Sequence, residues 1–183
     1  MSTKICFIHT TTNSNHDTED NVSTKNLYQY GRLISFDYSI GLHDENYTEM
    51  IKKSFIMTPS AIQFDNNYHN ITRDKAEKEG VVNTIALTQF KEDMKSVDII
   101  ISHNISFHLK AMQVECFRAT VTIDFSKYTL VDTMSFNPKY TIPLLPLLIK
   151  KLKLKIKSKE TLEQIKAVFF NLYNIYDTIQ VES

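Results

Sequence analysis

The sequence is poor in glycine, proline and cysteine. Three glycines among 183 residues are too few to build a glycine-rich loop around a nucleotide phosphate. The two cysteines, Cys6 and Cys116, exclude a disulfide scaffold and predict a reducing, intracellular compartment.

Long apolar runs and an excess of charge of one sign are also missing. The longest apolar run, residues 142–149, contains two prolines and is far too short for a membrane helix. No basic-then-apolar leader opens the chain, so we expect no membrane partner. The 21 basic and 21 acidic residues give a formal net charge of zero, which argues against a histone-like polycation.

The remaining composition is that of a globular protein. Hydrophobic residues make up 42% of the chain and charged residues 23%, which is enough apolar surface for one sizeable core. We therefore predict a single domain over residues 1–183, with a flexible loop at residues 10–26 and a tail at residues 177–183.

Hydrophobic patterning predicts strands first and then helices that alternate with short strands. The predicted strands cover residues 4–9, 27–40 (with a bulge at Gly31), 51–57, 97–102 and 130–131. The predicted helices cover residues 72–80, 82–95 (with Ile85, Phe90 and Met94 near one face), a segment capped by Asn104 or Ser106, residues 143–152, and residues 158–176 with Ser158 as the cap. This order favours an α/β or α+β domain whose sheet mixes antiparallel and parallel pairs.

Charge is unevenly placed along the chain. Residues 1–49 hold three basic and seven acidic residues, whereas residues 139–166 hold eight lysines and two glutamates. A lysine run of this kind is either a solvated helix face with its connecting loop or a patch that contacts phosphate or an acidic partner. The lysines that are candidates for nucleic-acid binding are Lys150, Lys151, Lys153, Lys155 and Lys157.

The sequence contains, in order, the fragments CFIHTTT (residues 6–12), DIIISHNISFH (98–108), LVDTM (130–134) and SKETLEQI (158–165). Their order resembles that of the motifs of the DnaQ-like (DEDD) 3′–5′ exonucleases. Residues 6–12 (CFIHTTT) resemble the first strand motif, which ends in Asp-x-Glu in that family, and residues 98–108 (DIIISHNISFH) resemble the second, His-Asn-x-x-Phe-Asp. Residues 130–134 (LVDTM) resemble a Val-Asp-Thr-Leu strand, and residues 158–165 (SKETLEQI) resemble the helix of the third motif. The resemblance implies a ribonuclease H-like fold, with a mixed five-stranded sheet flanked by helices.

The catalytic positions that the resemblance implies are all substituted. The family's chemistry needs four carboxylates around two divalent metals, which clamp the attacking water and the leaving oxygen. Here the five expected positions fall on His9, Thr11, His108, Lys159 and Gln164. Imidazole, hydroxyl and amide groups do not replace carboxylate oxygens around Mg²⁺, and a lysine at the base position stays protonated near neutral pH. The sequence therefore predicts that nuclease chemistry and its metal cofactor are lost.

A transition-metal site is a separate possibility. In the implied fold, His9 and His108 lie close together, with His103 and Asp132 nearby. Histidines with a carboxylate are ligands for Zn²⁺. No local ligand spacing such as His-x-x-x-His supports this interpretation, so the simpler prediction is that these polar residues fill a former metal cleft.

Three functional hypotheses follow. The leading one is a catalytically inactive exonuclease-like subunit in DNA or RNA metabolism, which binds single-stranded nucleic acid (with Asn104 and Phe107 as further candidates) or a protein of a replication, repair or transcription assembly. The alternative is an active 3′–5′ exonuclease that holds Mg²⁺ or Mn²⁺ at a displaced site built from Asp132, Glu160 or Glu163 together with the histidines. The third is an unrelated α/β interaction protein, which a sheet without the antiparallel-then-parallel order would indicate.

Overall fold

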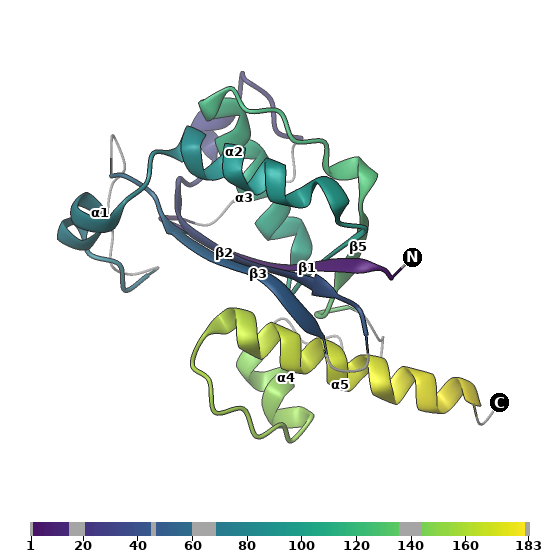
Figure 1. The fold of residues 1–183 in the computed structure, drawn as a ribbon. Helices are drawn as coiled ribbons and strands as arrows, with labels where there is room; N and C mark the ends of the chain where they lie inside the picture. The colour runs from purple at the N-terminus through teal and green to yellow at the C-terminus, as the bar shows by residue number, and fades with distance from the viewer. Residues whose placement is uncertain (1, 15–20, 45–46, 60–68, 136–143, 182–183) are drawn as a thin grey trace.

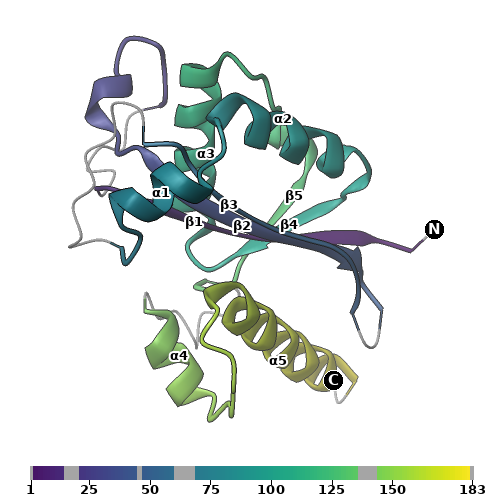
Figure 2. The ribbon, with the colours of Figure 1, turned by 60° about the vertical axis from the view of Figure 1, so that its left-hand side comes forward.

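The computed structural model describes residues 2–14, 21–44, 47–59, 69–135 and 144–181, with the backbone alone for residues 174–181. A five-stranded sheet forms the middle layer, as Figure 1 and Figure 2 show. The helices α2 (Asn83–Asp93) and α3 (Ile105–Ala119) cover one face, and α4 (Leu145–Lys151) and α5 (Thr161–Val181) cover the other. The prediction of a sheet flanked by helices is confirmed.

The order of strands across the sheet is β3-β2-β1-β4-β5. The strands are β1 (Lys4–Thr12), β2 (Leu33–Leu42), β3 (Thr48–Ile56), β4 (Ile99–Ser102) and β5 (Thr129–Asp132). β1, β2 and β3 pair antiparallel, whereas β4 pairs parallel with β1 and β5 pairs parallel with β4. The predicted antiparallel-then-parallel order is therefore present.

The remaining elements are short. They are α1 (Arg73–Glu79) and the single-turn 3₁₀ helices η1 (Leu27–Gln29), η2 (Met94–Ser96) and η3 (Phe125–Lys127). Within the described ranges, no helix combines the length and the apolarity needed to cross a membrane.

The alternation of side chains along β1 creates two cores. Cys6 and Ile8 belong to the core beneath α2 and α3, whereas Ile5 and Phe7 belong to the core beneath α4 and α5. Successive strand residues point to opposite faces of a sheet. His9 therefore follows Ile5 and Phe7 and lies on the face that α5 covers.

The first turns of α1 and α3 are capped in different ways, one by a neighbouring residue and the other by a residue distant in sequence. Thr72 caps α1 as predicted, because its hydroxyl accepts the backbone N–H of Lys75 at 3.2 Å. Asn104 stands at the N-cap position of α3 with left-handed backbone (φ 66°), but its side chain makes no cap hydrogen bond. The carboxylate of Asp132 on β5 accepts the N–H groups of Asn104 and Ile105 instead, at 2.8 and 3.2 Å.

The prediction of one strand over residues 27–40 is wrong in its first part. Residues 27–29 form η1, β2 begins at Leu33, and Gly31 lies outside any strand. The cause is Arg118 on α3, whose guanidinium donates to the carbonyl oxygens of Leu27, Tyr30 and Gly31. These carbonyls point toward Arg118 and so do not join a ladder. The irregularity between β2 and β3 falls at Ile40/Gly41 instead.

The limits of the predicted loop and tail also differ. β1 continues to Thr12, because pairing with β2 extends through Thr10 and Thr11, so the first three residues of the predicted 10–26 loop are strand. α5 continues through Val181, so the predicted tail at 177–183 begins within a helix.

Three predicted helix details differ as well. Ile85 of α2, predicted near the buried face, is 62% exposed, while Phe90 and Met94 are buried. The hydroxyl of Ser158 accepts the N–H of Glu160 at 3.1 Å, but α5 begins later, at Thr161. α4 begins at Leu145, and Pro143, its predicted first residue, lies outside the described residues.

Candidate functional site

His108, the second-motif position, is buried and fully hydrogen-bonded. The backbone N–H of Thr10 donates to its Nδ1 at 3.0 Å, and the hydroxyl of Thr10 lies 2.8 Å from the same nitrogen. Because a backbone N–H only donates, Nδ1 is an acceptor and the ring proton resides on Nε2. Nε2 lies 3.1 Å from the carbonyl oxygen of His103, to which it donates. His108 is thus a neutral crosslink between α3, β1 and the segment after β4.

His9 lies beside His108, as predicted. The two ring centroids are 4.9 Å apart, with 64° between the planes. Nδ1 of His9 is buried and forms no hydrogen bond with any described residue. Burial lowers the pKa of His9, and the carboxylate of Asp37, its partner in the β1–β2 register, raises it in part. The imidazole is therefore neutral at pH 7.

The other positions that the resemblance assigns lie on β1 and at the start of α5. Thr11 pairs with Ser35 of β2, and the side-chain amide of Gln164 on α5 donates to the carbonyl oxygen of Ser158 at 3.3 Å. Lys159 is exposed ahead of α5, and Phe107 is half-buried with its ring edge-on to His108.

Asp132 retains a carboxylate, but that carboxylate accepts hydrogen bonds from backbone N–H groups. Besides the two α3 amides, it accepts the N–H of Met134 at 2.9 Å. His103 is similarly occupied, because its Nδ1 lies 3.0 Å from the hydroxyl of Thr133. Both side chains form hydrogen bonds with residues of the segments that follow β4 and β5.

These residues do not fit a pair of divalent metal ions. The nitrogens of His108 have no lone pair free for a ligand bond, and the carboxylate of Asp132 already accepts three hydrogen bonds. In the part of the chain that the structure describes, no three His, Cys, Asp or Glu side chains lie close enough together to hold a metal ion. A two-metal site needs several carboxylates directed at one point, and this arrangement lacks them.

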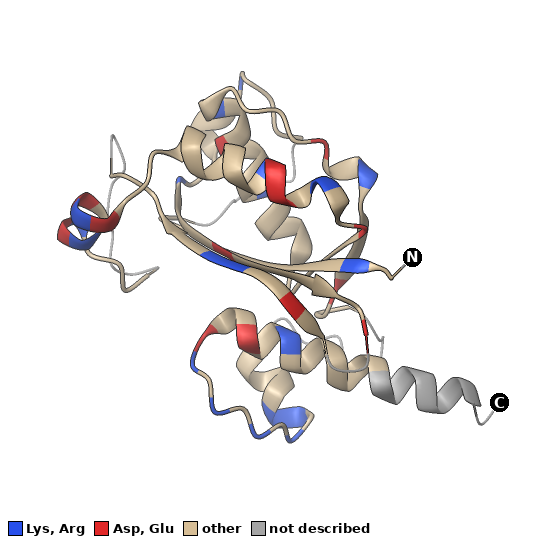
Figure 3. Ribbon diagram, viewed as in Figure 1, with Lys and Arg blue, Asp and Glu red and all other residues tan. Residues whose placement is uncertain are grey.

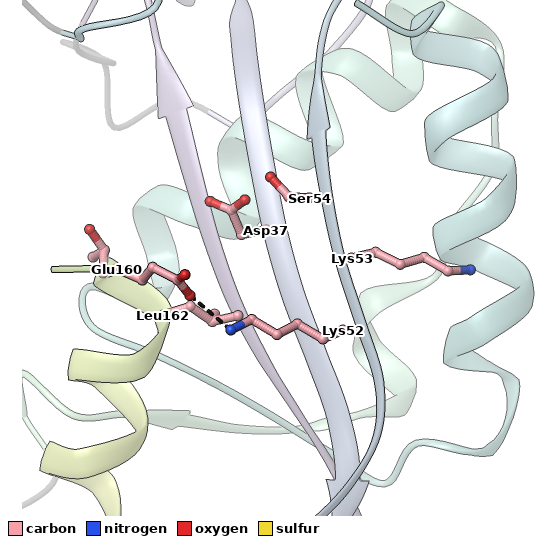
Figure 4. A pocket seen from close by; sticks show the side chains of 7 residues that line it. Asp37, Lys52, Lys53, Ser54, Glu160 and Leu162 are labelled. Carbon is pink, nitrogen blue, oxygen red and sulfur yellow. Dashed lines mark hydrogen bonds and ion pairs between the residues drawn. The ribbon is translucent and has the colours of Figure 1, made fainter. Parts of the chain in front are cut away.

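A pocket of about 370 Å³ opens between the sheet and the start of α5. Figure 4 shows its lining: Asp37, Lys52, Lys53, Ser54, Glu160, Thr161 and Leu162. The ammonium group of Lys52 donates to the carboxylates of Glu160 and Glu163, each at 2.8 Å. These two hydrogen bonds raise the pKa of Lys52 above its ordinary value, so Lys52 is a permanent cation. Lys52 therefore forms ion pairs with both Glu160 and Glu163.

A second lysine holds α5 against the sheet. Lys166 is buried, donates to Glu49 of β3 and to Glu163, and lies 5.2 Å from the centroid of the Tyr47 ring. Burial alone would raise the pKa values of Glu49 and Glu163, but hydrogen bonds from lysines outweigh it, so both pKa values are lowered. Glu49 and Glu163 are therefore ionised at neutral pH.

Sequence reasoning missed most of this pocket. The signal for Asp37 was available, because Ser35, Asp37 and Ser39 alternate with apolar residues along β2 and so share one face. No comparable signal pairs Lys52 with Glu160, since they are 108 residues apart.

Comparison with known proteins gives a result at the level of the fold. The sequence matches no family model and no curated protein. Among solved structures, it is similar to a chain of the SSB/Exonuclease I complex with the inhibitor CFAM, with a TM-score of 0.71 and 12% identity over 93% of this chain. It is also similar to the nuclease domain of 3′hExo, a DEDDh family member, bound to rAMP, with a TM-score of 0.63 and 13% identity over 97% of this chain. The chain has the exonuclease, ribonuclease H-like fold.

The exonuclease fold spans different shares of these proteins. The chain corresponds to 93% of the 3′hExo nuclease domain but to only 41% of the Exonuclease I chain. A further match, with a TM-score of 0.62 and 13% identity, is to a chain of the structure of the yeast NOT1 MIF4G domain co-crystallised with CAF1, where 96% of this chain and 80% of that chain are covered. At these identities the similarity establishes the exonuclease fold and leaves activity to the residues of the site.

Proposed function

We propose that this protein is a catalytically inactive exonuclease-like protein that acts as a binding subunit in DNA or RNA metabolism. The observation that carries the proposal is the bonding of His108, at the position where the resemblance implies a metal-binding aspartate. Both of its ring nitrogens are used inside the protein. The other implied positions, His9, Thr11, Lys159 and Gln164, also lack a carboxylate.

Loss of those acids changes what the cleft can do. Four carboxylates repel phosphate unless metals neutralise them, whereas neutral side chains do not. A metal-free cleft of this fold then accommodates a nucleic-acid strand without cutting it. The similarity to a structure of NOT1 with CAF1 supports a protein partner as the other occupant. Cys6 and Cys116 are free thiols, which agrees with a reducing, intracellular compartment.

An active exonuclease with a displaced site is the second candidate. One observation favours it, namely that Asp37 and Glu160 line the same pocket. Against it, Glu160 is already paired with Lys52, which would have to be displaced before a divalent ion could bind. Two carboxylates are also fewer than a two-metal mechanism requires.

Calorimetry and a cleavage assay test the proposal. Titration of the protein with Mg²⁺ and Mn²⁺ is expected to give no saturable heat, and labelled single-stranded DNA and RNA are expected to release no mononucleotides above an EDTA control. Saturable binding together with mononucleotide release would overturn the proposal. The variant Lys52→Met then locates a displaced site, because freeing Glu160 from its ion pair should tighten metal binding there.

A further inference from the structure

The segment between α4 and α5 concentrates exposed positive charge. Residues 150–159, here named the lysine strap, contain six lysines, all exposed: Lys150, Lys151, Lys153, Lys155, Lys157 and Lys159. Figure 3 shows blue stretches that alternate with tan along the segment from α4 to the start of α5. No acidic residue interrupts the strap.

The acids nearest to the strap do not neutralise it. Glu160 and Glu163 follow it directly in the chain, but Lys52 pairs with both and Lys166 pairs with Glu163. Lys150, Lys153, Lys155, Lys157 and Lys159 form no ion pair with any described residue. The charge of the strap is therefore available to a partner.

The strap presents its lysines at a regular spacing. Exposed lysines alternate with the half-buried residues Leu152, Leu154 and Ile156. Leu152 and Leu154 pack against the core beneath α5, so they hold the segment in place. Lys153, Lys155, Lys157 and Lys159 are therefore exposed positions of a segment that Leu152 and Leu154 anchor to the core.

Lys153 adds an independent observation. It has left-handed backbone (φ 55°), which L-residues other than glycine adopt at a cost of about 1–2 kcal/mol. The N–H of Leu154 donates to the carbonyl of Ile149 and that of Lys153 to the carbonyl of Lys150, which is the Schellman ending of a helix. Glycine is the usual residue at this position, and here a lysine occupies it. A charged residue is therefore present at a position whose left-handed backbone favours glycine.

We propose that the lysine strap binds the phosphodiester backbone of a nucleic acid. This inference rests on the binding role proposed above. The strap contains no arginine, whose guanidinium binds carboxylates with two hydrogen bonds, and no aromatic residue, whose ring stacks on bases. A regular row of point charges matches a repeating phosphate and binds it without regard to sequence.

Fluorescence anisotropy in EDTA tests this proposal, with labelled 20-nucleotide DNA, 20-nucleotide RNA and a 20-base-pair duplex as probes. The strap variant is Lys153→Gln/Lys155→Gln/Lys157→Gln. The matched control is Lys75→Gln/Lys78→Gln/Lys95→Gln, which removes the same charge from exposed positions elsewhere. Circular dichroism and the melting temperature confirm that both variants are folded.

The strap variant is expected to bind at least about tenfold more weakly at low salt, and the control to bind like the wild type. The slope of log Kobs against log salt should fall by about 2 for single strands and by nearly 3 for the duplex, since each phosphate contact contributes about 0.7 or 0.9. The three probes show which nucleic acid is preferred. Absence of binding by the wild type, or equal losses in both variants, overturns the proposal.

A competitor separates nucleic acid from an acidic protein. Polyglutamate of equal charge is expected to displace the probe poorly, and displacement as efficient as that by unlabelled oligonucleotide overturns the assignment to phosphate. Because EDTA removes divalent metals, this result is independent of the cleavage assay. Cleavage in Mg²⁺ would contradict the proposed inactivity and would not affect the proposal that the strap binds nucleic acid.

Discussion

The imidazole rings of His9 and His108 meet edge to face, with 4.9 Å between their centroids. The ring nitrogens of His108 are held by Thr10 and by the carbonyl of His103, whereas Nδ1 of His9 is buried with no hydrogen-bond partner among the described residues. The pair joins β1 to α3 in the neutral state. Protonation of His9 therefore adds a charge inside the protein.

The first prediction is a loss of stability at mildly acidic pH. Burial lowers the pKa of His9 below the ordinary value of about 6.5, so the unfolded chain binds this proton more readily than the folded protein. The free energy of unfolding should then fall as pH drops from about 6.5 toward the folded pKa. Urea denaturation at pH 7.5 and pH 5.5 measures the effect. In His9→Gln the difference between the two pH values should shrink, and an unchanged difference would assign it to other groups.

The second prediction concerns Glu115, which is fully buried on α3. Its carboxylate accepts hydrogen bonds from Arg32, Arg118, Asn83 and the backbone of Leu33, at 2.7–3.2 Å. Replacement by glutamine leaves two guanidinium groups without their anion. We expect Glu115→Gln to lose about 3–5 kcal/mol of unfolding free energy.

Urea denaturation checks the Glu115 prediction, with Glu92→Gln as the control. Glu92 pairs with Lys95 at the surface, where such a pair contributes at most about 1 kcal/mol. A Glu115→Gln protein as stable as this control would show that the network carries little energy.

The third prediction concerns the docking of α5. Lys166 is 9% exposed and bonds Glu49 and Glu163, so Lys166→Met should cost about 2 kcal/mol at pH 7. The lowered pKa values of Glu49 and Glu163 mean that their contribution is complete above about pH 4.3 and is lost as pH falls through the folded values. Thermal melts between pH 6 and pH 3 should show a steeper decline in the wild type than in Lys166→Met. Parallel declines would contradict this account.

The fourth prediction is a gain of stability. Lys153→Gly removes left-handed strain of about 1–2 kcal/mol and adds unfolded-state freedom of about 0.5–1 kcal/mol, so a net gain of about 0.5–1 kcal/mol is expected. Lys155→Gly is the matched control, because Lys155 does not have positive φ, and it should lose about 0.5–1 kcal/mol. Urea denaturation measures the free energy of unfolding of both variants. A decrease in both would contradict the backbone strain assigned to Lys153.

Local patterns predicted a large part of the fold. The apolar run at residues 97–102 predicted β4, the predicted strands at 27–40 and 51–57 contain most of β2 and β3, and Thr72 predicted the start of α1. Patterns of period two and 3.6 report on burial of neighbouring residues, which is why they succeed for such elements. They failed at residues 27–31, where Arg118 from α3 determines the backbone.

For this protein, the amino-acid sequence by itself determined the element order, the alternation that creates two cores, and the absence of acids at the five positions that the family resemblance assigns. Three interactions were decided only by the tertiary structure. The carboxylate of Asp132 caps α3, the N–H of Thr10 donates a hydrogen bond to Nδ1 of His108, and Lys52 forms an ion pair with Glu160 ahead of α5. The reason is physical, because hydrogen bonds and ion pairs act over a few ångströms. Their partners here are up to 108 residues apart in the chain, and only folding brings them within that range.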